Sequence, residues 1–311
     1  MESARCKAFL AAVETGSFSQ AAEKLGYTPS GVSQLINALE QELDLPLFYR
    51  TRKGVQLTEA GQQILPAVQE LIQQENRIYE LAAASKGLLI GSITIATYSS
   101  IAACWLPPII RRFQEDYPQI SINMMEGIWP EVSGWLDSHT ADLAFLSYQE
   151  GFPYEWIPLA PVQLYAVLPL SHPLADADAY PIERAAHEKF ILSFQKQDSD
   201  IMSALEKQHI KPHVCISTAD NITALSMIEH GVGIGFFNGL VLKNRPDNVA
   251  VLPLTPPHTL TFGLAVSDPE VLSPAARRFR EYVLEEFQKE HIPLHAHTAA
   301  ASARHVNTIW I

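Results

Sequence analysis

Uncharged hydrogen-bonding side chains lie along one face of a helix that the sequence predicts over residues 30–43. That polar face carries Ser30, Ser33, Gln34, Asn37 and Gln41, whereas apolar residues recur on the opposite face at Val32, Leu35, Ile36, Leu39 and Leu43. The spacing of the apolar residues predicts one buried stripe. Ser, Asn and Gln can both donate and accept, which suits contact with base edges in a major groove. We therefore expect Ser33, Gln34 and Asn37 to face DNA bases.

Helix-capping residues before this helix and a basic turn after it predict a winged helix-turn-helix. Ser17 or Ser19 can cap a short helix over residues 20–25, and Thr28-Pro29-Ser30 starts the next helix with a hydroxyl and a fixed φ. Three cations, Arg50, Arg52 and Lys53, then surround a turn at Gly54, where they could hold phosphates. The predicted DNA-binding residues are Ser17, Thr28, Pro29, Ser30, Ser33, Gln34, Asn37, Arg50, Arg52 and Lys53.

The alternative is an ordinary amphipathic helical unit with a solvated polar face and a surface charge cluster. The order helix, turn, helix and hairpin, with the cations confined to the hairpin, favours the DNA-binding interpretation over this alternative. The charge balance by itself does not, because residues 1–60 hold six Lys and Arg against seven Asp and Glu. The whole chain of 311 residues has a net charge of −12, so most of the acidity lies outside the helix-turn-helix.

A family resemblance rests on many positions of this stretch. They are Phe9, Gly16-Ser17-Phe18, Ala21-Ala22, Leu25, Val32-Ser33, Ile36, Leu39-Glu40, Leu43, Leu47-Phe48, Arg50 and Leu57-Thr58-Glu59-Ala60-Gly61. The pattern closely resembles the DNA-binding domain of LysR-type transcriptional regulators. One departure is Thr28-Pro29-Ser30-Gly31, where that family often has Ser-Gln-Pro-Ala. The resemblance therefore implies DNA binding but does not carry over an operator sequence.

A long helix is predicted to follow, after a helix over residues 3–15 and the winged unit, so we place domain boundaries at 1–58 and 59–87. Within it, Ile64, Val68, Leu71, Ile78 and Ala82 form one apolar row, and Leu65, Ile72 and Tyr79 form a second. Pro66 should kink this helix. The rows suit either a partner helix or the chain's own core. The resemblance, in which this helix links domains and pairs subunits, favours a homodimer and implies a homotetramer.

Residues 88–290 alternate short β-rich runs with helices, which predicts a parallel α/β fold. The first block reads as strand 89–97, helix 101–116, strand 119–125, helix 130–138 and strand 141–146, and a second block covers 189–237. We interpret Val162–Leu168 and Thr261–Ser267 as crossovers between two subdomains. Subdomain I then spans about 88–162 plus 267–290, and subdomain II about 163–266. Three stretches resemble landmarks of the same family, whose effector half is similar to periplasmic solute-binding proteins. They are Asp142-Leu143-Ala144-Phe145, Ser171-His172-Pro173-Leu174 and Gly231-Val232-Gly233-Ile234-Gly235.

Ligand-binding residues are expected where strands end and helices begin in two facing subdomains. The candidates are Thr97, Tyr98, Ser99, Ser100, Trp129, Ser147 and Tyr148 in subdomain I, and Ser193, Phe194, Asn221, Thr223, Phe237 and Asn238 in subdomain II. Ser99 or Ser100 should also cap the helix that follows. Each side chain could instead fill a core or cap a helix. Hydroxyls, amides and aromatics without a basic residue predict a small polar or anionic organic metabolite as effector.

Other functions find little support in the sequence. Gly231-Val232-Gly233-Ile234-Gly235 lies in a predicted strand and lacks the spacing of a dinucleotide loop. We expect no catalytic residues, metal or cofactor. A solute-binding or enzymatic α/β protein with an N-terminal interaction domain is the alternative. Three dispersed cysteines and no long apolar run predict a cytoplasmic protein without disulfides or a membrane segment. Residues 291–311 are predicted to be a disordered tail.

Overall fold

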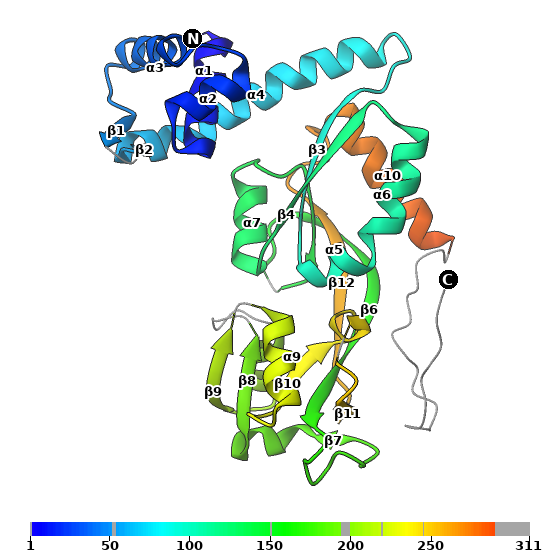
Figure 1. Ribbon diagram of the computed structural model, residues 1–311. Coiled ribbons are helices and arrows are strands. Elements are labelled where there is room, and N and C mark those ends of the chain that lie inside the picture. The colour runs from blue at the N-terminus through cyan, green and yellow to red at the C-terminus, as the bar shows by residue number, and fades with distance from the viewer. Residues whose placement is uncertain are drawn as a thin grey trace.

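A helical head, one long helix and an elongated body of two α/β subdomains make up the computed structural model (Figure 1). The structure describes residues 2–51, 54–149, 151–193, 200–218, 220–244 and 246–289. The predictions for Arg52, Lys53, Phe194 and the 291–311 tail therefore lie outside the described residues. The predicted fold class, a winged helix-turn-helix followed by two α/β subdomains, is confirmed.

The head contains three helices and a hairpin. They are α1 (Ser3–Thr15), α2 (Phe18–Leu25), α3 (Pro29–Leu43), β1 (Phe48–Thr51) and β2 (Gly54–Leu57). Phe9, Ile36 and Leu39 are fully buried in the core that the helices share. Gly54 opens β2 with a φ of +129°, and a Cβ there would lie 2.3 Å from the Gly16 carbonyl oxygen. The hairpin thus requires glycine where it packs against the loop between α1 and α2.

The long helix α4 (Glu59–Ala84) leaves the head and reaches the body. Thr58 caps it by accepting a hydrogen bond from the Gly61 N–H, and the helix continues through Pro66. Near its start the two apolar rows pack on the head, as Val68 is buried and Ile64, Leu65, Leu71 and Ile72 contact the head core. Further along, Ile78, Tyr79 and Leu81 are at least half exposed. The chain's own core therefore uses only the first half of the apolar rows.

Subdomain I is a sheet with helices on both faces. Its elements are β3 (Gly91–Thr97), α5 (Ser99–Cys104), α6 (Leu106–Asp116), β4 (Ile120–Glu126), α7 (Trp129–Asp137), β5 (Leu143–Ser147) and the C-terminal helix α10 (Pro274–Gln288). Helices α5, α6 and α10 share one apolar core with the sheet, whereas α7 covers the other face. The predicted helix 101–116 is wrong, because it breaks at Trp105 into α5 and α6. Pro107 and Pro108 lack the N–H groups that would continue one helix.

Subdomain II has the same layered plan. It contains β7 (Tyr180–Pro181), the short helix η1 (Ile182–His187), β8 (Lys189–Ser193), α8 (Asp200–Lys207), β9 (His213–Thr218), α9 (Asn221–Glu229), β10 (Gly235–Asn238), η2 (Val241–Asn244) and β11 (Val249–Thr255). The strand predicted over 232–237 is present but begins later than predicted. Gly231 has a φ of +74° just after α9, and β10 begins only at Gly235. A φ of +74° is left-handed, so Gly231 forms a turn that ends α9, and the strand follows this turn.

Two long antiparallel strands, β6 (Glu155–Pro169) and β12 (Thr259–Val266), join the subdomains. The first part of β6 pairs with β12 in subdomain I, and Leu164–Pro169 pairs with β10 and β11 in subdomain II. The strand order β4-β3-β5-β12-β6-β11-β7 has parallel pairs at both ends and antiparallel pairs in the middle. The parallel pairing expected from the alternation is present in β4-β3-β5 and in β8-β9, whereas the crossover segments β6 and β12 add antiparallel pairs. In the part of the chain that the structure describes, no helix is both long and apolar enough for a membrane span.

Candidate functional site

Helix α3 presents its polar face outward because its apolar stripe is fixed in the head core. Thr28 caps the helix by accepting from the Gly31 N–H at 3.1 Å, and Pro29 occupies the first turn. Val32, Ile36 and Leu39 are fully buried, so Ser30, Gln34 and Asn37 on the far side are exposed. Ser33 is partly exposed on the same side. This places the predicted base-reading residues on one accessible surface.

Arg50 lies against this surface, where the sequence predicted only a contact to phosphate. Its Nη2 donates to Asn37 Oδ1, its Nη1 lies 3.4 Å from Ser33 Oγ, and its guanidinium sits 5.2 Å from the centre of the Phe18 ring. Arginine has no acceptor, so the contact assigns the Asn37 oxygen to the Arg50 side. The Asn37 amide N–H groups then point away from Arg50. Strand β1 thus orients a side chain of α3.

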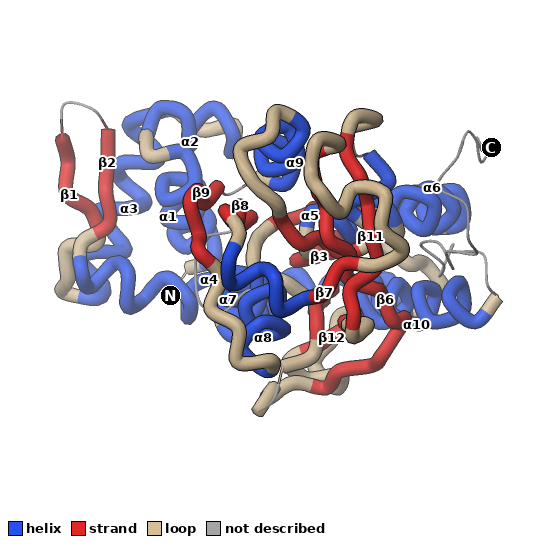
Figure 2. Tube along the Cα trace, turned by 90° about the horizontal axis from the view of Figure 1, so that it is seen from below, coloured by secondary structure: helices blue, strands red, loops and turns tan. Residues whose placement is uncertain are grey.

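The hairpin is held beside α3 by a second contact. Glu40 Oε1 accepts from the backbone N–H groups of Leu47 at 2.6 Å and Phe48 at 3.2 Å, and so fixes the chain where it enters β1. Figure 2 shows the β1–β2 hairpin at the outer edge of the head, next to α3. Ser17 caps α2 by accepting from the Gln20 N–H at 3.5 Å. The Ser17 hydroxyl thus serves as a helix cap, and its contact with DNA stays a prediction.

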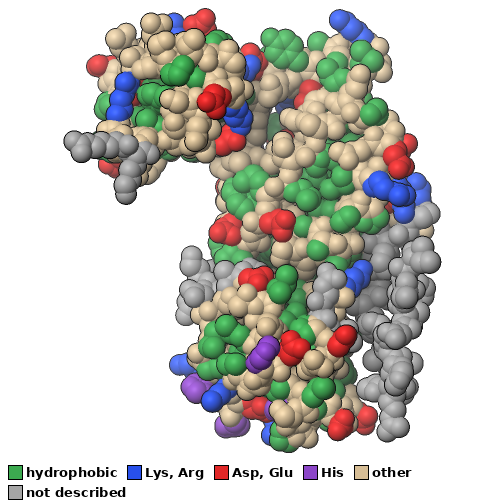
Figure 3. Space-filling model, viewed as in Figure 1, with side chains coloured by type: hydrophobic (Ala, Val, Ile, Leu, Met, Phe, Trp, Pro, Cys, Tyr) green, Lys and Arg blue, Asp and Glu red, His purple; other side chains and the backbone are tan. Residues whose placement is uncertain are grey.

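The head is electrostatically balanced by its own ion pairs. Arg5 pairs with Glu42, Lys7 with Glu75, and Lys24 with Glu14. Of the cations in residues 2–51, only Arg50 contacts neutral groups alone. On the face seen in Figure 3, basic and acidic side chains are scattered over the head. Arg50 is therefore the described cation best placed to meet a phosphate beside α3.

A cavity opens between the two subdomains, where both contribute walls. Its empty volume is about 740 Å³, the open mouth included. The predicted ligand-binding residues that line it are Tyr98, Ser99, Ser100, Trp129, Ser193, Asn221, Phe237 and Asn238. Helix starts of subdomain I meet strand ends and helix starts of subdomain II there, because β6 and β12 set the subdomains face to face.

Other predicted residues lie elsewhere. Thr97 is fully buried, and its hydroxyl donates to the Tyr98 carbonyl at 3.2 Å. Tyr148 is 55% exposed and packs on Phe152 and Trp156 outside the cavity. Thr223 donates to Asp220, the residue that caps α9. Each of these side chains is thus occupied structurally in the described chain.

The caps at the cavity differ from those predicted. Neither Ser99 nor Ser100 caps α5, because Tyr98 is the N-cap residue and makes no side-chain capping bond. Ser99 and Ser100 are the first helical residues, and the first intrahelical bonds run from Ile101 and Ala102 to the Tyr98 carbonyl. The N–H groups of Ser99 and Ser100 therefore precede the helical ladder.

Sequence reasoning missed Asp200, the first residue of α8. Ser147, which ends β5, donates to Asp200 Oδ1 at 2.7 Å, and the Tyr98 hydroxyl lies 3.0 Å from Ser147 Oγ. Ser147 belongs to subdomain I and Asp200 to subdomain II, so this chain of hydrogen bonds spans the cleft. In a sequence, a carboxylate at a helix start is normally interpreted as a capping residue, so the position of Asp200 in the cavity wall was not predicted. Also missed were the apolar wall residues Leu164, Ile201, Val241 and Leu260.

Burial dominates the titration of these groups. It raises the pKa of Asp200 to about 6, although the hydrogen bond from Ser147 and the charge of Lys207 act in the opposite direction. Burial likewise raises the pKa of the Tyr98 hydroxyl, and the charge of Asp200 adds to that rise. The carboxyl group of Asp200 thus ionises near neutral pH inside a largely apolar wall.

The potential metal ligands of the described chain, those of the cavity wall included, are His, Cys, Asp and Glu side chains. Among the residues the structure describes, no three His, Cys, Asp or Glu side chains come together in a way that could hold a metal ion. Cys6 is buried, and burial raises the pKa of its thiol; it raises that of Cys104 too. These thiols are poor nucleophiles in this setting.

Comparison with known proteins identifies the same two parts. Residues 4–62 match the model of the "Bacterial regulatory helix-turn-helix protein, lysR family", and residues 86–288 match the "LysR substrate binding domain". YvbU of Bacillus subtilis, an uncharacterized HTH-type transcriptional regulator, is 32% identical over 91% of this chain and 98% of its own length.

Solved structures agree on the fold. A full-length OxyR variant from Pseudomonas aeruginosa has a TM-score of 0.72 at 20% identity, covering 94% of this chain and 96% of its own. Full-length CbnR in complex with its target DNA has a TM-score of 0.66 at 19% identity, covering 92% of this chain and 99% of its own. At these identities the likeness concerns the architecture of head, linking helix and paired subdomains.

Proposed function

The chain belongs to the LysR family of transcriptional regulators, and from that premise we propose that a small polar metabolite in the interdomain cavity controls how its head binds DNA. The observation that carries this proposal is the shared wall of the cavity. Because Tyr98 and Trp129 line the cavity from one subdomain and Asp200 lines it from the other, an occupant touches both. Only a ligand that favours one arrangement of the subdomains can shift the protein toward it.

In this proposal α3 enters the major groove of double-stranded DNA with Ser33, Gln34 and Asn37 toward the bases. Asn37 presents amide N–H groups, since Arg50 holds its oxygen. It therefore favours acceptors on the base edges, such as the N7 atom of a purine. Arg50 lies at the border of the same face and would meet a neighbouring phosphate. Arg52 and Lys53 follow in the sequence and are proposed to extend that contact along the backbone.

Pairing of chains would strengthen a head that is nearly neutral. A single head with few unpaired cations gains little from phosphate contacts, so two or four linked heads would bind far more tightly than one. The exposed apolar residues Ile78, Tyr79 and Leu81 on α4 offer a surface for a second copy. We propose a homodimer through this helix and a homotetramer built from two dimers. The regulator would act in the cytoplasm, without catalysis and without a cofactor.

The test is a footprint of the purified protein on the intergenic DNA beside its own gene. The same experiment includes a panel of small organic acids, amines and amino acids. Protection whose length or pattern changes with one class of compound is expected. Protection that no compound alters would contradict the sensing proposal while leaving DNA binding in place. An absence of protection at moderate salt would contradict the proposed role of the head.

A further inference from the structure

The described cavity wall contains one carboxylate, that of Asp200, and only one of its two oxygens accepts a hydrogen bond from a described residue. Asp200 Oδ1 accepts from Ser147, and Ser147 in turn contacts the Tyr98 hydroxyl. No residue that the structure describes donates to Asp200 Oδ2. The carboxylate is thus anchored by one oxygen while the other remains for an occupant of the cavity. Since Ser147 lies in subdomain I, this hydrogen bond also orients Asp200 across the cleft.

The described cavity wall supplies no cation to balance this charge. Its lining includes no Lys, Arg or His among the residues described, and Asp200 is the one carboxylate there. Leu164, Ile201 and Leu260 surround the site with apolar surface. A buried carboxylate in such a wall is costly unless an opposite charge or several donors approach it. The described part of the cavity wall is therefore electrostatically complementary to a cation.

Donor groups occupy other parts of the wall. The indole Nε1–H of Trp129 is buried and has no hydrogen-bond partner among the described residues. Asn238 Oδ1 accepts from the backbone N–H groups of Leu240 and Val241, so the side-chain amide nitrogen is the atom that can donate to a ligand. A buried donor without an acceptor costs free energy, which an oxygen atom of a ligand would recover. These donors suit a carboxylate or carbonyl oxygen.

We propose that the effector carries a cationic amino group, which pairs with Asp200, together with a carboxylate or carbonyl oxygen that accepts from Trp129 and Asn238. An apolar amino acid, or a derivative that keeps both groups, has this chemistry. The inference rests on the proposed function and narrows its ligand class. A ligand with only anionic groups would place its charge beside Asp200 and would be repelled.

Matched sets of probes separate the two groups. One set is L-leucine, its deaminated analogue isocaproate and its decarboxylated analogue isoamylamine; the other is L-phenylalanine, hydrocinnamate and phenethylamine. Binding of each probe at millimolar concentration to the full chain is measured by saturation-transfer NMR and by the shift in unfolding temperature. We expect at least one amine-bearing probe to bind, the amino acid of its set to bind most tightly, and the deaminated acids not to bind.

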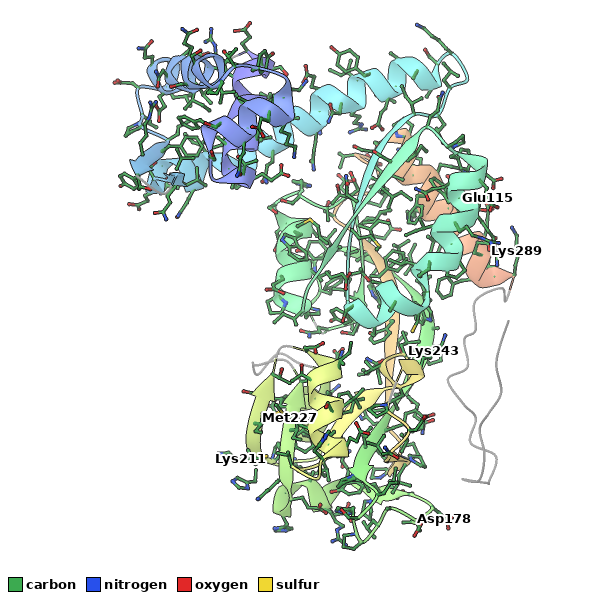
Figure 4. The ribbon with its side chains drawn as sticks, in the orientation of Figure 1. Glu115, Asp178, Lys211, Met227, Lys243 and Lys289 are labelled. Carbon is green, nitrogen blue, oxygen red and sulfur yellow. The ribbon has the colours of Figure 1, made fainter. Side chains whose placement is uncertain are left out.

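Variants then assign the selection to Asp200. Asp200→Asn should weaken binding of the amine-bearing probes by about tenfold or more, because a charged hydrogen bond is replaced by a neutral one. Asp200→Glu keeps the charge and should keep the preference for amines, provided that its thermal unfolding shows a folded protein. Asp178→Asn is the matched control, because it removes one carboxylate at the far end of subdomain II, away from the cavity (Figure 4). Its binding should equal that of the unaltered protein.

Three results would overturn the inference: tighter binding of the deaminated acids, binding of no amine-bearing probe, or unchanged amine binding by a folded Asp200→Asn protein. Footprints with the same probes distinguish this failure from failure of the proposed function. If an acid alone alters the footprint, the sensing function stands and the amine inference fails. If amines bind through Asp200 but no probe alters the footprint, the inference stands and the proposed coupling to DNA fails.

Discussion

The polar face of α3 draws on one helix, whereas the cavity draws on segments from Tyr98 to Leu260. In the head, a repeat of three and four residues buries Val32, Ile36 and Leu39 and thereby exposes the other side. In the cavity, Tyr98 and Asp200 meet because β6 and β12 set one subdomain against the other. The comparison teaches that a surface made by one helix follows from local periodicity, but a cleft follows from topology.

The two regions also differ in their charge. The head neutralises its described cations by pairing them with carboxylates, apart from Arg50, which contacts neutral groups. The cavity does the opposite, because it holds a carboxylate without a paired cation among its described lining. The head therefore suits a partner with an extended row of negative charges, to which it binds weakly. The cavity suits a small ligand with a local positive charge. Four predictions test whether these regions are as separate as this comparison says.

Removing core volume from α3 should have the largest effect. Ile36→Ala is expected to lower the free energy of unfolding of the head by about 2–4 kcal/mol, because a fully buried side chain leaves a cavity. Hydrogen exchange of the α3 amides would report this loss. Ligand binding in the interdomain cavity should be unchanged. Equal weakening of ligand binding would break the comparison, since it would show that the two regions fold as one unit.

Arg50→Ala should weaken binding to all DNA sequences by roughly 10- to 100-fold and reduce the dependence of affinity on salt. Arg50→Lys keeps the charge but loses the fork that orients Asn37, so it should recover affinity while relaxing base preference. Lys24→Ala is the control, because Glu14 already offsets that charge. Titration by fluorescence anisotropy at several salt concentrations measures these effects. An Arg50→Ala protein with unaltered affinity would remove this residue from the interface.

Acidification should act on the head and the body in opposite directions. Burial raises the pKa of Asp142 to about 6, above its ordinary value of 3.8, and the same holds for Asp200. The folded body then binds more protons than the unfolded chain between these values. Its free energy of unfolding should therefore rise as pH falls through about 6 to about 4, by on the order of 1–3 kcal/mol for each group.

In the head, hydrogen bonds from Lys7 and Ser3 lower the pKa of Glu75 below its ordinary value of 4.5. The stability this carboxylate contributes is fully present above 4.5 and is lost as pH falls below it, so the head should not gain stability on acidification. Hydrogen exchange of β3 and α3 amides across this range compares the regions. Asp142→Asn should flatten part of the rise in β3. A rise of equal size in α3 would contradict the assignment to the body.

The smallest effect is expected at the start of α5. Replacing Ser99 and Ser100 by Ala removes two hydroxyls but keeps the backbone N–H groups, so effector binding should weaken about five- to tenfold, at roughly 0.5–1.5 kcal/mol for each hydrogen bond lost. Binding to DNA without effector should be unaltered. Calorimetric titration with the bound probe and a DNA titration measure the two quantities. Loss of DNA binding would indicate that the change disturbs the fold rather than the cavity.

Prediction from sequence succeeded where an element carries its own signals. Thr28 and Pro29 start α3, and Thr58 caps α4, as expected for a hydroxyl before a helix. Prediction failed where an apolar pattern and the backbone preferences of proline or glycine pointed to different structures. A continuous apolar pattern predicted one helix over 101–116, but Pro107 and Pro108 divide it. The glycines of 231–235 fit a strand by their apolar neighbours, although Gly231 takes a positive φ.

The sequence by itself determined the family, the order of domains and the polar face of α3, because helix periodicity and caps act over a few residues. Only the tertiary structure decided what meets across long intervals of chain. It brought Arg50 onto Asn37, divided the apolar rows of α4 between the head core and solvent, and joined Ser147 to Asp200. Such contacts depend on how whole elements pack, and no local pattern around Asp200 distinguishes a capping carboxylate from one that faces a ligand cavity.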